Sequence, residues 1–429
     1  MRERITVPKS SQPIVAKITI PGSKSITNRA LPMAALADGV STLTGVLFSD
    51  DSRYFLQALQ TLGYQIEIDE EREQVIVHGQ GVKPLSQQAT YQLFIGNSGT
   101  SMRFLTAMVS LGQGTYELDG VARMRQRPMQ DMIDALSQLS VTIEDIDKTG
   151  CPPLRIQGKG LAGGTTKVRG TDSSQFLTGL LLAAPYAQNA ITIEVIGELV
   201  SEPYVVMTIA MMEQFGVKVS KDNQHYLIPT AMYHARHYAI EPDASGASYF
   251  MAAAAVTGGR VKIMGLTRAS LQGDTRFVDV LEAMGCEIGE DAEGIEVIGP
   301  QEGLQGIDVD LFAMSDLVPT LAAIAPLAKS PVTIRNVSNI RLKETDRIAA
   351  CVTELRKFGV TVEEYPDGLK VYPCSSFHHD VHVHTYEDHR IAMAFSILGM
   401  VVGDTHIEDP GCVAKTFPDY FDRLFRVIK

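Results

Sequence analysis

The chain has 429 residues, of which 45% are hydrophobic and 21% charged, a composition typical of globular proteins and unlike that of disordered ones. Its formal net charge of −12 argues against general binding to nucleic acid, which depends on a basic surface. No apolar run approaches the roughly 18 residues that indicate a membrane-spanning helix, and the N-terminal segment lacks the apolar stretch of a signal peptide. The five cysteines are scattered and include no CxxC pair, so we expect reduced thiols in a cytoplasmic protein.

In chain order, the first predicted element is a strand, because Ile5–Ile20 alternates between apolar and polar residues. A pattern then recurs six times, at intervals of about 70–75 residues. Each copy starts with a Gly-, Ser- or Asp-rich turn that leads into a helix of small apolar residues, and a strand-like stretch and a second helix follow. The copies start at Pro21, Gly96, Thr171, Asp243, Met314 and Tyr386. Since one unit cannot bury its apolar face alone, neighbouring copies must share a hydrophobic core.

The length favours two domains, because single cores stop growing below this size. Three copies of the repeat fall within residues 21–240 and three within 241–429, with a linker near His237–Pro242. With the last copy ending at the C-terminus, we expect the N-terminal strand to complete the second domain. The prediction is therefore one domain of residues 21–240 and one of residues 1–20 plus 241–429.

The two kinds of helix differ in where they carry charge. The first helix of each copy has few charged residues, as in FMAAAAV from Phe250, so it should be buried on all sides. The second helices, such as KETDRIAACVTELRKF from Lys343, are amphipathic and should lie on the outside. The expected fold class is therefore α/β (α+β): a two-domain, inside-out α/β barrel with buried helices and outer sheets.

Cationic side chains gather at the turns where the helices begin. They are Lys24, Arg29, Arg103, Arg123, Arg125, Arg127, Lys343, Arg347, Arg390 and Lys415. Helix starts ordinarily favour acidic residues, so cations at nearly every start indicate a bound anion. Arginine with backbone N–H groups suits phosphate and carboxylate, which predicts small, multiply charged anionic substrates.

Two carboxylates and one polar triplet accompany these cations, and each has two interpretations. Asp316 and Glu344 could move protons, or they could act as a helix cap and as an ion-pair partner of Lys343 or Arg347. The triplet Ser173–Ser174–Gln175 could cap a helix or donate hydrogen bonds to a phosphate.

Other motifs point to no further chemistry. The run His378–His384 places four potential ligands on one face of a strand, but we favour a solvated edge strand over a metal site. Lys24 lacks the glycines of a phosphate-binding P-loop, and no GxGxxG segment follows a strand.

Seven segments together resemble the signatures of the 5-enolpyruvylshikimate-3-phosphate synthase family. They are PGSKSITNRALPMAALA, LFIGNSGTSMRFL, RMRQRPMQDMIDAL, SSQFLTGLLLAAP, IRLKETDR, YEDHRIAMAFS and DPGCVAKTFPDYF, and they span all six copies. The resemblance implies two domains of three βαβαββ units each. It also implies transfer of the enolpyruvyl group of phosphoenolpyruvate to the 5-hydroxyl of shikimate 3-phosphate, with release of phosphate, in aromatic amino-acid biosynthesis. It implies no metal and no organic cofactor.

The resemblance assigns roles to individual residues. Shikimate 3-phosphate would be bound by Lys24, Ser25, Arg29, Ser173, Ser174, Gln175, Ser201, Tyr204, Asp316, Asn339 and Lys343. Phosphoenolpyruvate would be bound by Lys24, Gly99, Arg127, Gln175, Arg347, Arg390 and Lys415. Asp316 would accept the proton of the 5-hydroxyl, while Glu344 and Lys24 would handle protonation of the methylene carbon and its reversal.

In GNSGTSMRFL, Ser101 and Phe104 replace an Ala and a Pro of many relatives, whereas Gly99 is retained. We therefore expect inhibition by glyphosate. Separately, we expect the protein to act as a monomer. One alternative is the sister transferase that acts on UDP-N-acetylglucosamine, although Val121–Gln126 lacks the reactive cysteine of that family. Another is a non-catalytic anion-binding repeat protein, in which Asp316 and Glu344 would only weaken binding.

Overall fold

The structure is a computed structural model that describes residues 3–86 and 89–428. The chain divides into two compact units. The central unit is Gly22–Ile240, and the flanking unit consists of the chain up to Pro21 together with the chain from Glu241 onward. The backbone joins the two parts of the flanking unit closely, because the N–H of Asp243 donates to the carbonyl of Pro21 at 2.9 Å.

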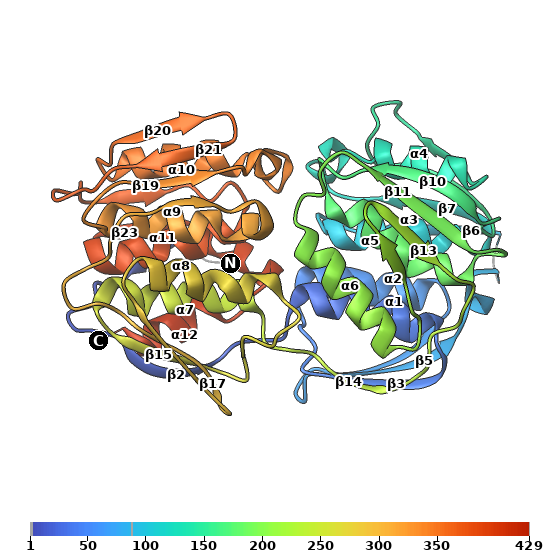
Figure 1. Cartoon of the computed structure of the whole chain (residues 1–429), viewed down its shortest axis with the longest axis horizontal. Coiled ribbons are helices and arrows are strands. Elements are labelled where there is room, and N and C mark those ends of the chain that lie inside the picture. Colours follow the sequence, from blue (N-terminus) through green and yellow to red (C-terminus); the bar gives the residue numbers. More distant parts are fainter. Residues whose placement is uncertain (1–2, 87–88, 429) are drawn as a thin grey trace. The chain divides into compact units, whose positions relative to one another are not determined.

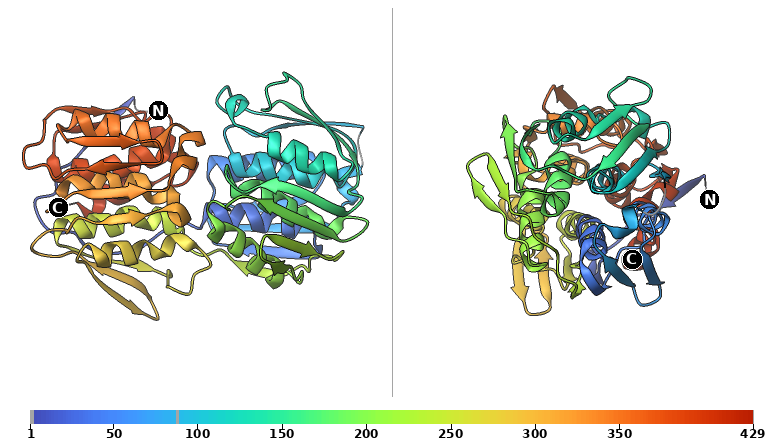
Figure 2. Two further views of the ribbon diagram at one scale, coloured as in Figure 1. Left: turned by 45° about the horizontal axis from the view of Figure 1, so that its top comes forward. Right: turned by 90° about the vertical axis from the view of Figure 1, so that its right-hand side faces the viewer.

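In the central unit, a buried helix and a second helix alternate with short strands (Figures 1 and 2). The helices are α1 (Lys24–Leu36), α2 (Asp50–Thr61), α3 (Gly99–Val109), α4 (Gln130–Gln138), α5 (Ser174–Ala183) and α6 (Glu202–Gln214). The strands are β3 (Asp38–Thr44), β4 (Gln65–Asp69), β5 (Gln74–Gln80), β6 (Thr90–Phe94), β7 (Gln113–Asp119), β8 (Thr142–Asp145), β9 (Leu154–Lys159), β10 (Gly164–Arg169), β11 (Ile191–Ile196), β12 (Ser220–Asp222), β13 (His225–Ile228) and β14 (His237–Ala239).

The strands of the central unit form three sheets with the same internal order. They run β14-β3-β5-β4, β6-β7-β9-β8 and β10-β11-β13-β12. In each sheet the first two strands are parallel and the remaining pairs are antiparallel. The parallel pair is joined through a buried helix in the second and third sheets, as a crossover connection requires.

The flanking unit repeats this plan. Its helices are α7 (Ala244–Thr257), α8 (Phe277–Ala283), α9 (Val318–Ile324), α10 (Arg347–Lys357), α11 (His389–Val402) and α12 (Tyr420–Val427). Its strands are β1 (Arg4–Val7), β2 (Val15–Thr19), β15 (Arg260–Met264), β16 (Glu287–Asp291), β17 (Gly294–Ile298), β18 (Asp308–Asp310), β19 (Val332–Arg335), β20 (Val362–Tyr365), β21 (Gly368–Val371), β22 (Val381–Val383) and β23 (Thr405–Glu408). The sheets run β16-β17-β15-β2, β18-β19-β21-β20 and β1-β23-β22.

The N-terminal segment differs from the sequence-based prediction of one strand over Ile5–Ile20. It forms two strands, β1 and β2, which join different sheets of the flanking unit. Strand β2 lies immediately before α1 in the sequence but pairs with β15 in the flanking unit. Conversely, β14 lies immediately before α7 but pairs with β3 in the central unit. The two units therefore exchange the strands that precede their first helices.

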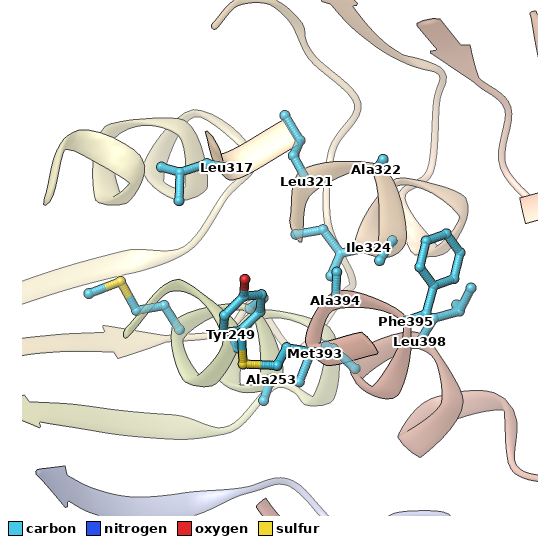
Figure 3. Packing of buried hydrophobic residues seen from close by; sticks show 14 of the residues in the cluster. Tyr249, Ala253, Leu317, Leu321, Ala322, Ile324, Met393, Ala394, Phe395 and Leu398 are labelled. Atoms are coloured by element: carbon cyan, nitrogen blue, oxygen red, sulfur yellow. The ribbon is translucent and has the colours of Figure 1, made fainter. Parts of the chain in front are cut away.

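The first helices form the cores, as the scarcity of charge predicted. Helices α1, α3, α7 and α11 are buried over nearly their whole length, whereas α2 and α10 are buried along one face only. In the flanking unit, apolar side chains of α7, α9 and α11 pack together, among them Tyr249, Ala253, Leu321, Ile324, Phe395 and Leu398 (Figure 3). The predicted fold class, α/β with buried helices, is confirmed.

Candidate active site

In the flanking unit, the buried guanidinium of Arg347 binds three carboxylates. Arg347 is the first residue of α10, and its side chain is 1% exposed. Its Nη1 lies 3.0 Å from Asp316 Oδ1, its Nη2 lies 2.8 Å from Glu344 Oε2, and its Nε lies 2.8 Å from Asp388 Oδ2. One buried cation therefore holds together the two carboxylates for which the sequence allowed a role in proton transfer.

Three further cations surround Asp316 and Glu344. Arg390 Nη2 lies 2.8 Å from Asp316 Oδ2, and Lys343 Nζ lies 3.7 Å from Asp316 Oδ1. Lys415 Nζ lies 2.9 Å from Glu344 Oε1. The side chains of these cations come from α11, from the turn before α10, and from the 3-10 turn Pro410–Lys415. All the flanking-unit residues assigned to proton transfer or to phosphoenolpyruvate thus share one cluster.

The cluster decides the ionisation of Asp316. Burial raises the pKa of its carboxyl group, but Arg390, Lys343 and Arg347 lower it by more, so that this pKa lies well below its ordinary range. Asp316 is consequently a carboxylate at every physiological pH, and it is a weak base as long as all three cations face it.

The alternative of a helix cap for Asp316 is wrong. Helix α9 begins at Val318, and its N-cap position is Leu317, which makes no side-chain capping hydrogen bond. The other first helices begin at side chains that accept a hydrogen bond from the helix backbone: Ser23, Ser98, Ser173, Asp243 and Asp388. In the copy of the repeat that starts at Met314, the acidic side chain therefore binds arginines instead of capping its helix.

The sequence reading missed Asp388 as a member of the cluster. Asp388 caps α11 by accepting from the backbone N–H of Arg390 at 2.9 Å, and it also binds Arg347. The segment EDHR, with an acidic residue at a helix start close to an arginine, could have indicated that Asp388 belongs to the cluster. Asn339, assigned to shikimate 3-phosphate, contacts the residue that precedes Asp316: its Nδ2 donates to Ser315 Oγ at 3.1 Å.

A second carboxylate that the sequence reading missed lies beside Asp316. Asp274 is 3% exposed and accepts a short hydrogen bond from the hydroxyl of Ser245. Ser245 Oγ lies 3.4 Å from Arg390 Nη2, so this pair adjoins the cluster. Burial, and secondarily the charge of Asp316, raise the pKa of Asp274 from 3.8 to about 6.

Replacing Asp274 by asparagine is expected to stabilise the protein at neutral pH. A pKa raised in the folded state means that the folded chain binds the proton more tightly, so this stabilising contribution is complete below pH 3.8 and is lost as the pH rises through 6. Because Asp274→Asn resembles the protonated form, its gain in unfolding free energy should be small at pH 4 and about 2–3 kcal/mol above pH 6. Denaturant unfolding at both pH values measures this difference.

The control for this prediction is Asp422→Asn, a change at an exposed position of α12. It should shift the unfolding free energy equally little at both pH values. A gain for Asp274→Asn that does not depend on pH would contradict the raised pKa.

In the central unit, Arg29 links α1 to α3 and α6. Its Nε donates to Thr208 Oγ1 at 2.8 Å, its Nη1 to the carbonyl of Ser25 at 2.8 Å, and its Nη2 to the carbonyl of Tyr204 at 3.3 Å. Its guanidinium also lies 5.4 Å from the centre of the Phe104 ring. Burial lowers the pKa of Arg29 to about 10, so the side chain is still a cation at neutral pH. Three residues assigned to shikimate 3-phosphate are thus brought together.

Lys24 begins α1 and faces the start of α2. Its Nζ lies 3.4 Å from Asp51 Oδ2, and the two side chains are 14% and 4% exposed. The hydroxyl of Ser101 donates to the backbone carbonyl of Asp51 at 3.2 Å. Ser101 therefore contacts Asp51, the partner of Lys24, and Phe104 contacts Arg29.

Gly99 and Arg127 are in direct contact. A Cβ atom added to Gly99 would lie 2.4 Å from Arg127 Nη2, so a side chain there would displace the guanidinium. Arg127 Nη1 donates to the carbonyl of Asn97 at 3.1 Å. Arg125, by contrast, is half exposed and pairs with Asp119 at 2.5 Å, and the half-buried Arg123 donates to Gln126 Oε1 at 3.2 Å. Of the three arginines in RMRQRP, the structure therefore places only Arg127 with Gly99.

The remaining predicted residues of the central unit lie at the starts of α5 and α6. Ser173 does cap α5, since its Oγ accepts from the backbone N–H of Gln175 at 3.2 Å, and Ser174 is buried in the first turn. Ser201 precedes α6 and has a left-handed backbone with a φ of 53°. A left-handed non-glycine residue is uncommon and is often found at binding sites.

Comparison with known proteins decides the family. The profile of the family described as EPSP synthase (3-phosphoshikimate 1-carboxyvinyltransferase) matches residues 8–424. A relative from Nostoc sp. with the name 3-phosphoshikimate 1-carboxyvinyltransferase is 52% identical over 99% of this chain and 100% of its own length. A relative of the same name from Vibrio cholerae is 46% identical over 96% of both chains. The chain belongs to the EPSP synthase family.

Solved structures agree with this membership. An EPSP synthase from Acinetobacter baumannii has a TM-score of 0.80 and 25% identity, covering 99% of this chain and 98% of its own. The enolpyruvyl transferase NikO from Streptomyces tendae has a TM-score of 0.77 at 15% identity, covering 98% and 96%, and it shares the fold alone. In the described part of the chain, no helix has the length and apolar character needed to cross a membrane.

Proposed function

We propose that the chain transfers the enolpyruvyl group of phosphoenolpyruvate to the 5-hydroxyl of shikimate 3-phosphate and releases phosphate. The observation that carries this proposal is the buried cluster in which Arg347 joins Asp316 and Glu344 among further cations. Cations suit the phosphate and carboxylate groups of both substrates, and paired carboxylates suit a reaction that moves two protons. A protein that only bound anions would have no use for Asp316 and Glu344 there.

The proposed reaction is an addition followed by an elimination. Glu344 delivers a proton to the methylene carbon of phosphoenolpyruvate, which leaves cationic character on the neighbouring carbon. The 5-hydroxyl oxygen attacks that carbon while Asp316 accepts the hydroxyl proton, and this gives a tetrahedral intermediate. Loss of a proton from the new methyl group and departure of phosphate then restore the double bond. Lys24 takes part with Glu344 in these proton transfers at carbon.

Binding of the substrates would also activate Asp316. Arg347 and Arg390, assigned to phosphoenolpyruvate, and Lys343, assigned to shikimate 3-phosphate, are the cations that lower its pKa. Substrate carboxylate and phosphate groups compete for these same cations. When they bind, less positive charge acts on Asp316, so its basicity rises at the moment when a base is needed.

The residues that bind each substrate are part of the proposal. Shikimate 3-phosphate is assigned to Lys24, Ser25, Arg29, Ser173, Ser174, Gln175, Ser201, Tyr204, Asp316, Asn339 and Lys343. Phosphoenolpyruvate is assigned to Lys24, Gly99, Arg127, Gln175, Arg347, Arg390 and Lys415. The contacts of Arg29 with Ser25 and Tyr204, and of Gly99 with Arg127, support grouping these residues by substrate.

The direct test is an assay of phosphate release. The purified protein is mixed with shikimate 3-phosphate and phosphoenolpyruvate, and phosphate is followed together with the product by mass spectrometry. Phosphate release that requires UDP-N-acetylglucosamine in place of shikimate 3-phosphate would assign the chain to the sister activity. Tight binding of both substrates without turnover would favour a non-catalytic anion-binding protein.

We further propose that the protein acts as a monomer in the cytoplasm. Sedimentation under the conditions of the assay tests the oligomeric state.

Replacing Lys24 by methionine should raise the KM for phosphoenolpyruvate at least about tenfold, because one charged hydrogen bond to an anion is lost. The kinetic effect should exceed the effect on folding: methionine fills most of the same volume, so any fall in melting temperature should come from the loss of the lysine partner of Asp51. The matched control is Lys167→Met, in which the lysine pairs with Glu194 at 3.0 Å on the exposed side of β10. Equal kinetics for both variants would remove Lys24 from the site.

Replacing Gly99 by alanine should weaken the binding of both phosphoenolpyruvate and glyphosate. We expect glyphosate to compete with phosphoenolpyruvate, because its phosphonate and carboxylate groups present similar charges. The new methyl group would overlap Arg127 Nη2 and displace the guanidinium, so the KM for one and the Ki for the other should rise together. Competition kinetics measure both constants. No effect of millimolar glyphosate on the unmodified protein would refute the expected inhibition.

A further inference from the structure

Two histidine side chains outside the catalytic cluster lie opposite each other on paired strands. The edge strand β22 runs parallel to β23, and His382 is in register with His406. The centres of the two imidazole rings are 4.7 Å apart. Residues in register on neighbouring strands project from the same face of the sheet, so the two rings form a pair on one face.

Asp380 brings a carboxylate to the same two rings. Its Oδ1 lies 3.5 Å from His382 Nε2 and 3.2 Å from His406 Nε2. The three potential donor atoms all lie within 4.8 Å of one another. Ligands at about 2.0–2.2 Å from a tetrahedral zinc ion are about 3.2–3.6 Å apart, so both carboxylate–imidazole separations fit a shared ion.

The ring of His406 is held from behind by a third strand. Thr6 of β1 lies opposite His406 in the antiparallel pair of β1 and β23, and Thr6 Oγ1 lies 2.9 Å from His406 Nδ1. A hydrogen bond at one ring nitrogen fixes the orientation of the imidazole and leaves the other nitrogen for an ion. Histidine ligands of metals ordinarily have such a partner.

We propose that Asp380, His382 and His406 form a binding site for a divalent transition-metal ion of the class of Zn²⁺, Ni²⁺ and Co²⁺. Two imidazoles with one carboxylate suit this class, whereas Mg²⁺ and Ca²⁺ prefer sets of oxygen ligands. The side chains of Asp380, His382 and His406 are 80%, 40% and 20% exposed, so water completes the coordination. The ion would join β22 to β23, the strands that precede and follow α11.

The sequence reading favoured an edge strand for His378–His384, and β22 does lie at a sheet edge. However, the strand comprises only Val381–Val383, and Asp380 has a left-handed backbone with a φ of 52°. The strand alternation therefore does not extend to His378, whose Nδ1 instead lies 3.1 Å from the carbonyl of Lys357. The second imidazole comes from His406, which the pattern within the run could not reveal.

Calorimetric titration with Zn²⁺ or Co²⁺ alone tests the proposal, on protein without a histidine tag and freed of metal by a chelator. One ion should bind per chain, and His382→Ala and His406→Ala should each weaken binding at least about tenfold. The matched control is His384→Ala. His384 Nδ1 lies 3.2 Å from Glu408 Oε2, and this imidazole should not be needed for binding of the ion. Equal affinity in all four proteins, or loss of binding in the control alone, would overturn the assignment.

Variants of Thr6 test the orientation of His406 without touching a ligand. Thr6→Val should weaken Co²⁺ binding about tenfold, and Thr6→Ser should bind Co²⁺ like the unmodified protein.

The absorption spectrum of bound Co²⁺ should show nitrogen and oxygen ligands. Saturating ion should raise the melting temperature of the unmodified protein but not that of His382→Ala. A melting temperature that does not respond to the metal would contradict a bridge between β22 and β23. Enolpyruvyl transfer should proceed at the same rate with and without the ion.

Discussion

Asp316→Ala is expected to lower the turnover number about 10²–10⁴-fold, which is the usual contribution of a positioned acid or base. Alanine can neither accept the proton of the 5-hydroxyl nor balance Arg390 and Arg347, which bind the Asp316 carboxylate at 2.8 and 3.0 Å. Steady-state phosphate release measures the effect. Asp316→Asn retains the volume of the side chain but replaces one acceptor oxygen with an NH2 donor. It separates the loss of a base from the loss of shape and should be nearly as slow.

The pH dependence of turnover adds an independent test. In the unmodified protein, the acidic limb of the kcat profile should lie above the pH expected from the ligand-free Asp316, because substrates occupy the cations that lower its pKa. That limb should disappear in Asp316→Asn. The control is Asp367→Asn, an exposed change before β21 that should leave both rate and profile unchanged. A near-normal turnover number in folded Asp316→Ala would reduce Asp316 to an ion-pair partner.

Arg347→Met is expected to lower the free energy of unfolding by about 3–5 kcal/mol, the cost of breaking a buried ion pair by removing one partner. The variant leaves Asp316, Glu344 and Asp388 close together without the cation that binds all three. Turnover should fall sharply as well, because the same side chain is assigned to phosphoenolpyruvate. Denaturant unfolding measures the first effect, and phosphate release under conditions where the variant is folded measures the second.

The control for Arg347→Met is Arg335→Met on β19. Arg335 forms two hydrogen bonds of 2.6 Å with Asp308, but the arginine side chain is 57% exposed. Loss of such an exposed pair should cost no more than about 1 kcal/mol. The destabilisation by Arg347→Met should shrink at low pH, because the lowered pKa of Asp316 makes its stabilising contribution present at neutral pH and lost on acidification. Equal losses in the two variants would show that burial of Arg347 adds nothing.

Much of the fold could be predicted because local composition determines it. The stretch FMAAAAV in α7 contains no charge and is buried as far as Ala255. The Ser and Asp residues at the helix starts make the capping hydrogen bonds typical of their type. The sequence indicated that the N-terminal segment joins the flanking unit, as β2 does. It did not indicate that this segment forms two strands of different sheets, or that β14 pairs with β3, because only long-range pairing determines which sheet a strand joins.

The candidate site was predictable to the extent that each residue carries its own chemical signal. Cations at helix starts indicated Arg347 and Arg390, and the structure places both beside Asp316. Asp274 gave no such signal, since it lies in a turn where an acidic residue is ordinary, and only its burial beside Ser245 distinguishes it. The pairing of His382 with His406 depends on strand register, which no short motif encodes.

The separation of β1 and β2 from their partners has a consequence for synthesis on the ribosome. Strand β1 pairs with β23 near the opposite end of the chain, and β2 pairs with β15, which is translated only after the whole central unit. Domains generally fold as units while the nascent chain emerges. Gly22–Ile240 can therefore complete its sheets first, while β2 waits for β15 and β1 stays unpaired until β23 has been synthesised.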